Sequence, residues 1–434
     1  MQLVSDAKDT LRRFEARTDD YRVKAWQLSV TDASRLSVGL KDREIGGVYA
    51  PPATNRIISG SLYLVWHDGK VSQGNVNSLV LRDMENRLKR MRATAYKEEF
   101  VIDMPEDAEP PTVEIHDPAV GALLGDDSAA CFAMLEAIAP TLKNAETSFD
   151  GAAGATIAAL SVANSKGLDR SVQSSAQTFS ASADAVFGVG YRSRRRLDPA
   201  RALEHLLWLD ELLPSFHNVL EAPTSGRRPV LLLPGAAASF LGHFVLSNLD
   251  GESVANRSSA WAEDDFSSEL QVFDEAFSLG YDPTVDWMTR SYRMDGRGLM
   301  SRSVSYIDKG RLVSPIASLK AARQLSCVPT PVPSSSGLTI DAPDRAELRA
   351  LLASLDDAVV VPGVLGMHTQ DASRANYSLS VPSALVVKGG KIVGRCKAAL
   401  AGNFFEDLRE GVRPVDSPLH DSAGLFFETG VNFQ

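Results

Sequence analysis

Residues 229–261 constrain the fold of this chain more than any other segment; they read PVLLLPGAAASFLGHFVLSNLDGESVANRSSAW. An apolar run leads to a turn at Pro234-Gly235 and then to an apolar helix that has a single histidine, His243. A zinc-binding helix needs two imidazoles one turn apart, usually beside a glutamate that acts as general base. This helix has one imidazole and no neighbouring glutamate. The chain is therefore either not a metalloenzyme or the silent half of one.

Residues 229–248 also approach the length of a membrane span. Breaking residues interrupt this run, namely Pro234, Gly235, Ser239, Gly242 and His243. Such interruptions favour a buried strand followed by a buried helix over a transmembrane helix. We therefore expect no membrane partner.

Length and composition are those of a soluble globular protein with two domains. A chain of 434 residues is long for a single core, and 44% hydrophobic with 23% charged residues is an ordinary balance. The net charge of -10 argues against a nucleic-acid partner, because such binding depends on neutralising phosphates. The three cysteines form no Cys-x-x-Cys pair, and the first residues predict a polar helix rather than a targeting signal. We expect a cytoplasmic protein with reduced thiols.

The first half of the sequence predicts a mixture of helices and antiparallel strands. The Asp-Gly pair at Asp68-Gly69 and the segment Asn164-Ser165-Lys166-Gly167 are both typical of hairpin turns. We expect a surface loop at residues 104–111. Helices are expected at residues 6–22, 78–97, 126–144 and 198–213, and strands at residues 25–30, 34–40, 45–50, 59–66, 155–164, 170–182 and 183–192.

The second half predicts short strands joined by tight turns. Lys309-Gly310 and Gly389-Gly390 separate pairs of apolar segments and predict two hairpins. A few helices are expected, at residues 236–248, at 342–353 and from about Asn403 onward. The fold class is therefore α+β. It has an N-terminal mixed α/β domain with an antiparallel sheet and long helices (residues 1-222) and a C-terminal β-rich domain, sandwich-like or barrel-like (residues 223-434).

Four segments, taken in order, give the chain a family resemblance. They are SVANSKG at residues 161–167, LGHFVLSNLDGESVANRSSAW at 241–261, DGRGLMSRSVSYIDKGRLV at 295–313, and the closing strands SALVVKGGKIVGRCKAALAGNFFEDL at 383–408. Together they resemble the TldD/PmbA family, the so-called modulators of DNA gyrase, and within it the PmbA (TldE) branch. The resemblance covers nearly the whole length. Two departures, missing glycines and aromatics at residues 371–379 and Cys396 in a closing strand, suggest a divergent member with a specialised substrate.

The resemblance implies a division of work between two related chains. A TldD-like partner carries a His-Glu-x-x-x-His zinc helix and acts as a metallopeptidase. The PmbA-like chain lacks that motif and completes a groove-bearing heterodimer that takes extended, unfolded peptides. For this chain the resemblance implies no cofactor of its own, with zinc on the TldD-like partner, and a C-terminal domain that corresponds to the peptidase-like domain.

Five residues are candidates for the substrate cavity. His243 reads most simply as a core or interface histidine bonded to backbone or to a carboxylate, with a groove-lining role as the alternative. Metal binding within one chain would need recruits such as His217, His368 or His420, which do not share its helix face. The resemblance places the loop with Glu252, Asn256 and Arg257 at the cavity, where an arginine suits a peptide carboxylate. The candidates are His243, Glu252, Asn256, Arg257 and His368, with no catalytic or metal-binding residue assigned.

Other chemical readings are weaker. Cys396 as a nucleophile would need a paired base and a lowered thiol pKa, and a buried strand cysteine is more common. Ser239 lacks the Gly-x-Ser-x-Gly elbow. The glycine clusters at 151–154 and 188–190 lack a phosphate-binding pattern, so we interpret them as turns and strand ends. The basic runs at 87–97 and 192–196 are interpreted as solvated faces.

Two functional classes follow from the sequence. The first is a metal-free subunit of a heterodimeric TldD/TldE-type metallopeptidase that cleaves unfolded or precursor peptides. The second is a non-hydrolytic peptide-binding homodimer that presents a precursor peptide to other enzymes. A metal-free enzyme that uses Cys396 or His243 is a third and weaker alternative.

Overall fold

The computed structural model of the chain describes residues 2–41, 44–48, 50–125, 129, 131–136, 149–183, 187–200, 204, 214–416 and 422–434. Within these residues the chain is α+β, as the sequence predicts, and forms three sheets. The strands of the first sheet all come from residues 23–193, and those of the other two from residue 226 onward. The predicted division between residues 222 and 223 falls in the connection between these two sets.

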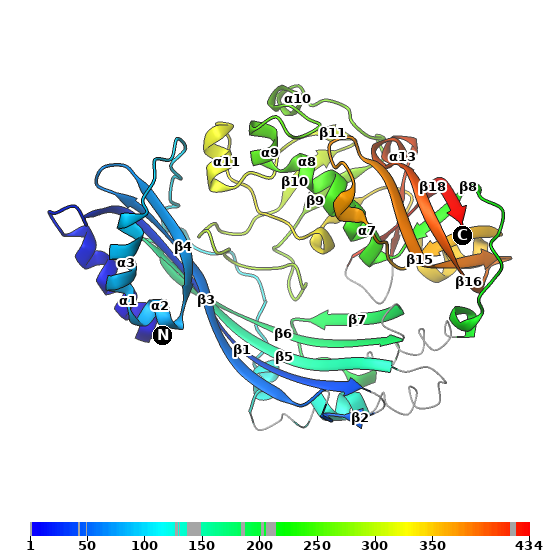
Figure 1. Ribbon diagram of the computed structural model, residues 1–434, viewed down its shortest axis with the longest axis horizontal. Helices are drawn as coiled ribbons and strands as arrows, with labels where there is room; N and C mark the ends of the chain where they lie inside the picture. The colour runs from blue at the N-terminus through cyan, green and yellow to red at the C-terminus, as the bar shows by residue number, and fades with distance from the viewer. Residues whose placement is uncertain are drawn as a thin grey trace.

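The N-terminal part is built on one long antiparallel sheet in the order β4-β3-β1-β5-β6-β7, with β2 paired to β1. Figure 1 shows these strands curving beneath the C-terminal part. The two strands expected at residues 25–30 and 34–40 are one strand, because Asp32 between them keeps its ladder partners Ile58 and Ala159. The bounds are β1 (Val23–Lys41), β2 (Glu44–Ile45), β3 (Ala53–Trp66), β4 (Val71–Asn77), β5 (Phe149–Asn164), β6 (Asp169–Ala183) and β7 (Phe187–Ser193).

Helices cover one end of this sheet. α1 (Gln2–Glu15), α2 (Ser78–Arg82) and α3 (Met84–Ala93) pack on a core that includes Trp26 and Trp66. The single helix expected at residues 78–97 divides at Asp83 and ends four residues early. A short helix α4 (Pro118–Ala122) lies on the same sheet near Ile157. The helix expected at 126–144 is helical at 129 and 131–136, and the remainder, like most of 198–213, lies outside the described residues.

The C-terminal part contains a four-stranded and a seven-stranded sheet. In the larger sheet β8 pairs with both β14 and β18, so β8, β14, β15, β16 and β18 close a hydrogen-bonded ring, which agrees with the predicted barrel-like domain. The bounds are β8 (Gly226–Leu232), β9 (Ser278–Tyr281), β10 (Val304–Asp308), β11 (Arg311–Leu312), β12 (Thr339–Asp341), β13 (Ala346–Glu347), β14 (Asp357–Val361), β15 (Asn376–Lys388), β16 (Lys391–Asn403), β17 (Arg413–Asp416) and β18 (Gly424–Phe433).

Two predicted hairpins of this part are confirmed. Lys309 and Gly310 have φ values of 49° and 72° between β10 and β11. Gly389 and Gly390, between β15 and β16, have φ values of 54° and 77°. Glycine is the residue that adopts positive φ without steric cost, so both turns follow from their local sequences.

The apolar helix of residues 234–249 is confirmed as one continuous helix of three segments, α7 (Pro234–Phe240), η1 (Leu241–Leu246) and α8 (Ser247–Leu249). Side chains on one face of the strand ring pack against it, and those on the other face pack against α12. α12 begins at 348 rather than 342, because Ala346 and Glu347 pair with β17. The remaining segments are α9 (Gly251–Ala255), α10 (Glu263–Ser267), α11 (Leu319–Gln324), η2 (Ser335–Gly337), α12 (Leu348–Ser354), η3 (Met367–Thr369) and α13 (Phe404–Glu410).

Residues 286–297 fasten the C-terminal part to the N-terminal sheet. The Arg194 guanidinium, on the residue after β7, donates to the carbonyls of Thr289 at 3.0 Å and Ser291 at 2.7 Å. Burial lowers the pKa of Arg194 to about 10. The interpretation of residues 192–196 as a solvated face is therefore wrong at Arg194, whose charge is compensated by backbone oxygens rather than by water. Gln27 on β1 adds a bond of 3.1 Å to the carbonyl of Arg297.

In the described part of the chain, no helix has the length and apolar character needed to cross a membrane.

Phe240 tests how strongly the helix depends on its aromatic contacts. Its ring lies 5.1 Å from that of Tyr377 and 5.2 Å from that of Phe404, with no exposed surface. We expect Phe240→Ala to lower the free energy of unfolding by about 3–5 kcal/mol, since it leaves a cavity in a packed core. Phe240→Leu, which retains most of the volume, should cost about 1.5 kcal/mol or less. Urea unfolding midpoints of the two variants would contradict this if they coincided.

Candidate functional site

His243 lies in the middle of the 234–249 helix, where the helix widens to a π-helical turn. Such turns are rare and are found frequently at functional sites. The His243 Nε2 atom is 3.0 Å from the carbonyl oxygen of Gln370, and its ring stands edge-on to Phe244. The reading as a histidine bonded to backbone is confirmed. The ring is half-buried and ties the helix to the loop around η3.

Asn248 fixes the next turn of the same helix. Its side chain is almost fully buried and donates to the carbonyls of Phe244 at 2.7 Å and Ala372 at 2.8 Å. Its Oδ1 accepts from the backbone N–H of Ala260 at 2.6 Å. One amide therefore holds the helix, the loop after η3 and the segment after α9, because each of its polar atoms is satisfied by a different segment.

Glu252 is a structural link in this arrangement. It lies on α9, and its carboxylate accepts from the Ser318 hydroxyl at 3.0 Å. Ser318 in turn accepts from the backbone N–H of Ala321 and so caps α11. The carboxylate connects the ends of two short helices, and its contact with Ser318 leaves part of the group accessible.

The three remaining candidates are exposed. Asn256 ends α9, and Arg257 follows it with a φ of 59°. The Arg257 side chain makes no hydrogen bond or ion pair with another residue of the described ranges. His368 lies on η3, two residues before Gln370. The structure therefore brings His243 to the loop that carries His368, while Glu252, Asn256 and Arg257 share the next helix and its end.

Cys396 and Ser239 are placed as ordinary structural residues. Cys396 is 5% exposed on β16, and burial raises the pKa of its thiol. A raised pKa keeps the thiol protonated at neutral pH, which opposes a role as nucleophile. The Ser239 hydroxyl donates to the carbonyl of Gly235, one turn earlier in the helix. The buried strand cysteine that the sequence favours is confirmed.

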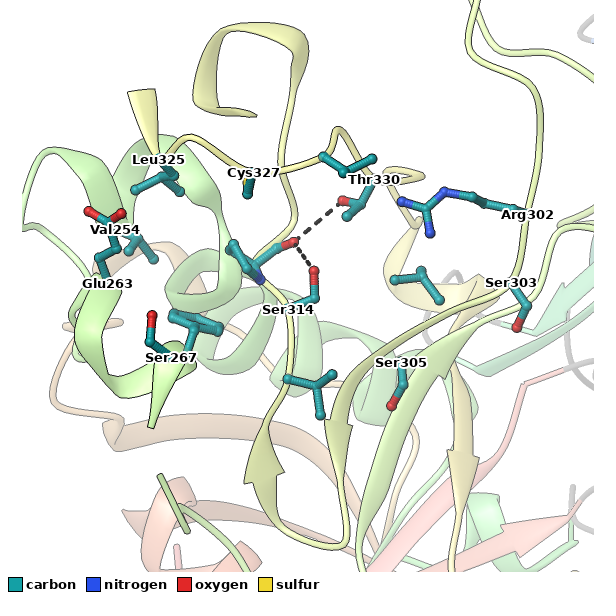
Figure 2. A pocket seen from close by; sticks show the side chains of 15 residues that line it. Val254, Glu263, Ser267, Arg302, Ser303, Ser305, Ser314, Leu325, Cys327 and Thr330 are labelled. Atoms are coloured by element: carbon teal, nitrogen blue, oxygen red, sulfur yellow. Dashed lines mark hydrogen bonds between the residues drawn. The ribbon is translucent and has the colours of Figure 1, made fainter. Parts of the chain in front are cut away.

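A cavity of about 530 Å³ opens on the other side of α9. Figure 2 shows Glu263 at one end and Arg302 at the other, with Cys327 and Ser314 between them. The walls come from five separate segments of the chain. Apolar and hydroxyl side chains dominate them: Val254, Phe266, Ser267, Ser303, Val304, Ser305, Val313, Pro315, Leu325, Val328 and Thr330.

A second cavity, of about 500 Å³, lies where α13 meets β18. Its lining includes Asp407, which is 6% exposed and accepts a hydrogen bond of 2.8 Å from the Tyr377 hydroxyl. Thr429 lies 2.6 Å from the same hydroxyl. Burial raises the pKa of Asp407 to about 7, against the opposing effects of Tyr377 and Arg227. This cluster is a buried polar network with one carboxyl group that titrates near neutrality.

Sequence reasoning missed both cavities. The sequence could have predicted that Asp407 is buried. Phe404 lies three positions before Asp407 and Leu408 one position after it on a predicted helix, and this spacing indicates a buried face. The first cavity had no comparable signal. Glu263, Arg302 and Cys327 lie on segments far apart in the sequence, and only the fold brings them together.

Comparisons with known proteins place the fold. Over 99% of this chain and 100% of the other, it superposes on TldE from Thermococcus kodakarensis with a TM-score of 0.79 and 15% identity. It superposes on a candidate modulator of DNA gyrase from Bacteroides thetaiotaomicron with a TM-score of 0.77 and 17% identity, over 100% of this chain and 98% of the other. A third such protein, a candidate modulator of DNA gyrase from Thermotoga maritima, superposes with a TM-score of 0.75 and 18% identity. This superposition covers 99% of this chain and 100% of the other. The class is thus the two-part α+β fold of these proteins.

Sequence comparison reaches the same group. Residues 225–425 match the family model described as the PmbA/TldA metallopeptidase C-terminal domain. The uncharacterized protein MJ0231 of Methanocaldococcus jannaschii is 26% identical over 156 residues, which cover 35% of this chain and only 36% of that protein. The family match therefore concerns the C-terminal part of the chain, and the whole chain shares the fold of TldE and of the candidate modulators of DNA gyrase.

The residues of the 234–249 helix do not fit the zinc ion of a metallopeptidase. Catalytic zinc sites use three protein ligands, and a helix supplies two of them from positions one turn apart. The positions one turn from His243 hold Ser239 and Ser247, whose hydroxyls donate to the helix carbonyls of Gly235 and Gly242. The imidazole itself is engaged with Gln370. Among the described residues, His, Cys, Asp and Glu form no group of three that suits a metal ion.

Asp407 should make stability depend on pH. Its folded pKa of about 7 lies above the ordinary aspartate value of 3.8, so its contribution to stability is full at low pH and falls as pH rises toward 7. We expect Asp407→Asn to lose this dependence and to be more stable than the parent chain at pH 8, by roughly 2–4 kcal/mol at about 1.4 kcal/mol per pKa unit. Urea unfolding from pH 4.5 to 8 measures the difference.

Glu406→Gln is the matched control for this prediction. Glu406 is the preceding residue on the same helix and is exposed. Glu406 contributes only weakly to the raised pKa of Asp407, so its replacement should leave the pH profile of the parent chain nearly unchanged. Parallel profiles for the parent chain and Asp407→Asn would show that the carboxyl group is not protonated in the folded state near neutrality.

Proposed function

We propose that this chain is the metal-free subunit of a heterodimeric TldD/TldE-type metallopeptidase that cleaves unfolded or precursor peptides. A TldD-like partner would supply the zinc, the general-base glutamate and the activated water. This chain would supply half of the substrate cavity. The observation that carries the proposal is the state of the 234–249 helix, where one imidazole is bonded to a carbonyl and hydroxyls occupy the positions one turn away.

The family match of the C-terminal part supports a role in peptide hydrolysis, since the matching family model describes a metallopeptidase domain. The comparison with TldE supports the assignment to the subunit type, although at 15% identity it concerns the fold alone. The division of work between two chains remains our inference. A cytoplasmic location likewise stays a prediction.

The proposed contribution of this chain is to bind and orient an extended peptide. The side of β10 turned away from β9 has no strand partner at Val304 and Ser305 within the described ranges, because β11 pairs only with Ile307 and Asp308. An unpaired strand edge binds an extended chain through backbone hydrogen bonds, whatever its side chains. Arg257 and His368 are exposed, the first after α9 and the second on the η3 loop that contacts His243, and both would contact carboxylate or carbonyl groups of the peptide.

Co-expression tests the proposal directly. This chain and the TldD-like chain from the same genome should form a stable one-to-one complex by size-exclusion chromatography with light scattering. The complex should hydrolyse an unfolded polypeptide, such as reduced and alkylated casein, and a chelator should abolish hydrolysis. The expected physical reason is that zinc activates the attacking water in the partner.

Two controls separate the alternatives. A Glu→Gln change in the partner's His-Glu-x-x-x-His motif should leave the complex intact and remove hydrolysis. This chain alone should be inactive. Zinc-dependent hydrolysis by this chain alone would overturn the proposal. A stable homodimer of twice 46.8 kDa that ignores the TldD-like chain would favour the non-hydrolytic presenting protein instead.

A further inference from the structure

The cavity between α9, α10 and β10 has a polarity that the family assignment does not explain. Glu263 provides a carboxylate at one end and Arg302 a guanidinium at the other, as Figure 2 shows. Both side chains are exposed, and neither takes part in an ion pair within the described ranges. Burial, and after it the charge of Glu263, raises the pKa of the Cys327 thiol, which lines the cavity between the two ends.

The walls of this groove, between the two charges, are partly apolar and open to solvent. Val313 and Val328 line it and are 44% and 70% exposed, so apolar surface faces solvent here. Phe266 and Leu325 form buried parts of the same wall. Exposed apolar surface between groups of opposite charge is unfavourable unless a ligand covers it. The volume of about 530 Å³ lies within the usual range of ligand cavities.

Hydrogen-bonding groups line the groove as well. Ser305 on β10 and Ser303, the residue before that strand, are exposed, and Ser314 lies across from them. Arg302 uses one guanidinium nitrogen to donate to the carbonyl of Pro329 at 3.0 Å. That bond fixes the side chain and leaves its other donors for a ligand. A planar guanidinium held in this way suits a carboxylate, which it can bind through two parallel hydrogen bonds.

We propose that this groove binds short linear peptides with free termini, the α-ammonium group at Glu263 and the α-carboxylate at Arg302. Such peptides are the products of peptide hydrolysis. This deepens the proposed function, and for its biological meaning it rests on that function. Binding itself requires only this chain.

Cys327 provides the readout. It lies in the groove and is exposed, while Cys131 and Cys396 are buried. A bound peptide should cover the Cys327 thiol and slow its alkylation by iodoacetamide, measured by intact mass. Burial raises the pKa of this thiol, so labelling is followed at pH 8.5, where more thiolate is present. Cys327→Ser should remove the rapidly labelled site and so identify it.

The probes are di- to hexapeptides of alternating Ala and Val, each prepared free, N-acetylated and C-amidated. We expect at least one length to protect Cys327. Each blocking group should weaken its protection by about 3- to 10-fold, the effect of one charge-assisted contact at a partly exposed site. Equal protection by free and blocked peptides, or no protection at any length, would overturn the proposal.

Two substitutions test which terminus of the peptide binds at Glu263 and which binds at Arg302. In Glu263→Gln, acetylation of the amino terminus should no longer matter, whereas amidation should still weaken binding. In Arg302→Gln the reverse should hold. Asp264→Asn and Arg323→Gln are matched controls, because both residues are exposed on neighbouring helices and do not line the groove. Their binding should equal that of the parent chain.

This experiment separates the two proposals. Protection of Cys327 in the isolated chain, together with failure to form an active complex, would leave the groove established and the metallopeptidase role refuted. An active complex, together with no protection of Cys327 in the isolated chain, would support the metallopeptidase role and refute peptide binding in the groove. Repeating the labelling on the complex with its TldD-like partner shows whether the groove stays open there.

Discussion

The packing of the 234–249 helix through Phe240 and Phe244 is the interaction on which the C-terminal part depends. Their ring centroids lie 5.1–6.1 Å from those of Tyr377 on β15 and Phe404 on α13. The helix is therefore held against both α13 and the closed ring of β-strands. Aromatic pairs of this kind bury large areas in a defined geometry. A fixed axis in turn determines where the neighbouring side chains of the helix point. His243, edge-on to Phe244, reaches the Gln370 carbonyl, and Asn248, one turn after Phe244, reaches the carbonyl of Ala372.

The same constraint explains why candidate residues lie on two sides of α9. Asp250 ends the long helix and caps α9 through a bond of 2.9 Å to Ser253, which turns the chain sharply. After this turn, Glu252 points to Ser318 and Val254 points into the cavity with Glu263 and Arg302. α9 is fixed at its start by this cap and along its side by the bond between the Glu252 carboxylate and the Ser318 hydroxyl. Within the described ranges, the His243–Gln370 contact shares no residue with the lining of the Glu263–Arg302 groove, so the two are separate sites.

Local chemistry was readable from the sequence, and long-range assembly was not. The turns at Lys309-Gly310 and Gly389-Gly390 and the start of α13 at Asn403 were predicted correctly, because positive φ and side-chain capping are properties of a few adjacent residues. Arg194 was misjudged, since a run of arginines normally faces water, whereas here the carbonyls of Ser175, Thr289 and Ser291 accept from its guanidinium. The Glu263–Arg302 groove could not have been found from the sequence, because it needs five segments that only the fold brings together.

The two cavities of the C-terminal part differ in how they hold charge, and this difference bears on what each can do. Asp407 is buried beside Tyr377, where desolvation favours the neutral carboxyl group, so this cluster acts as a satisfied part of the core. Glu263 and Arg302 keep their charges in water at opposite ends of an apolar trough. Separated, hydrated charges cost the folded state little and gain energy only when a ligand of matching polarity replaces the water between them. Selective recognition is therefore expected at the exposed pair, and structural support at the buried carboxyl group.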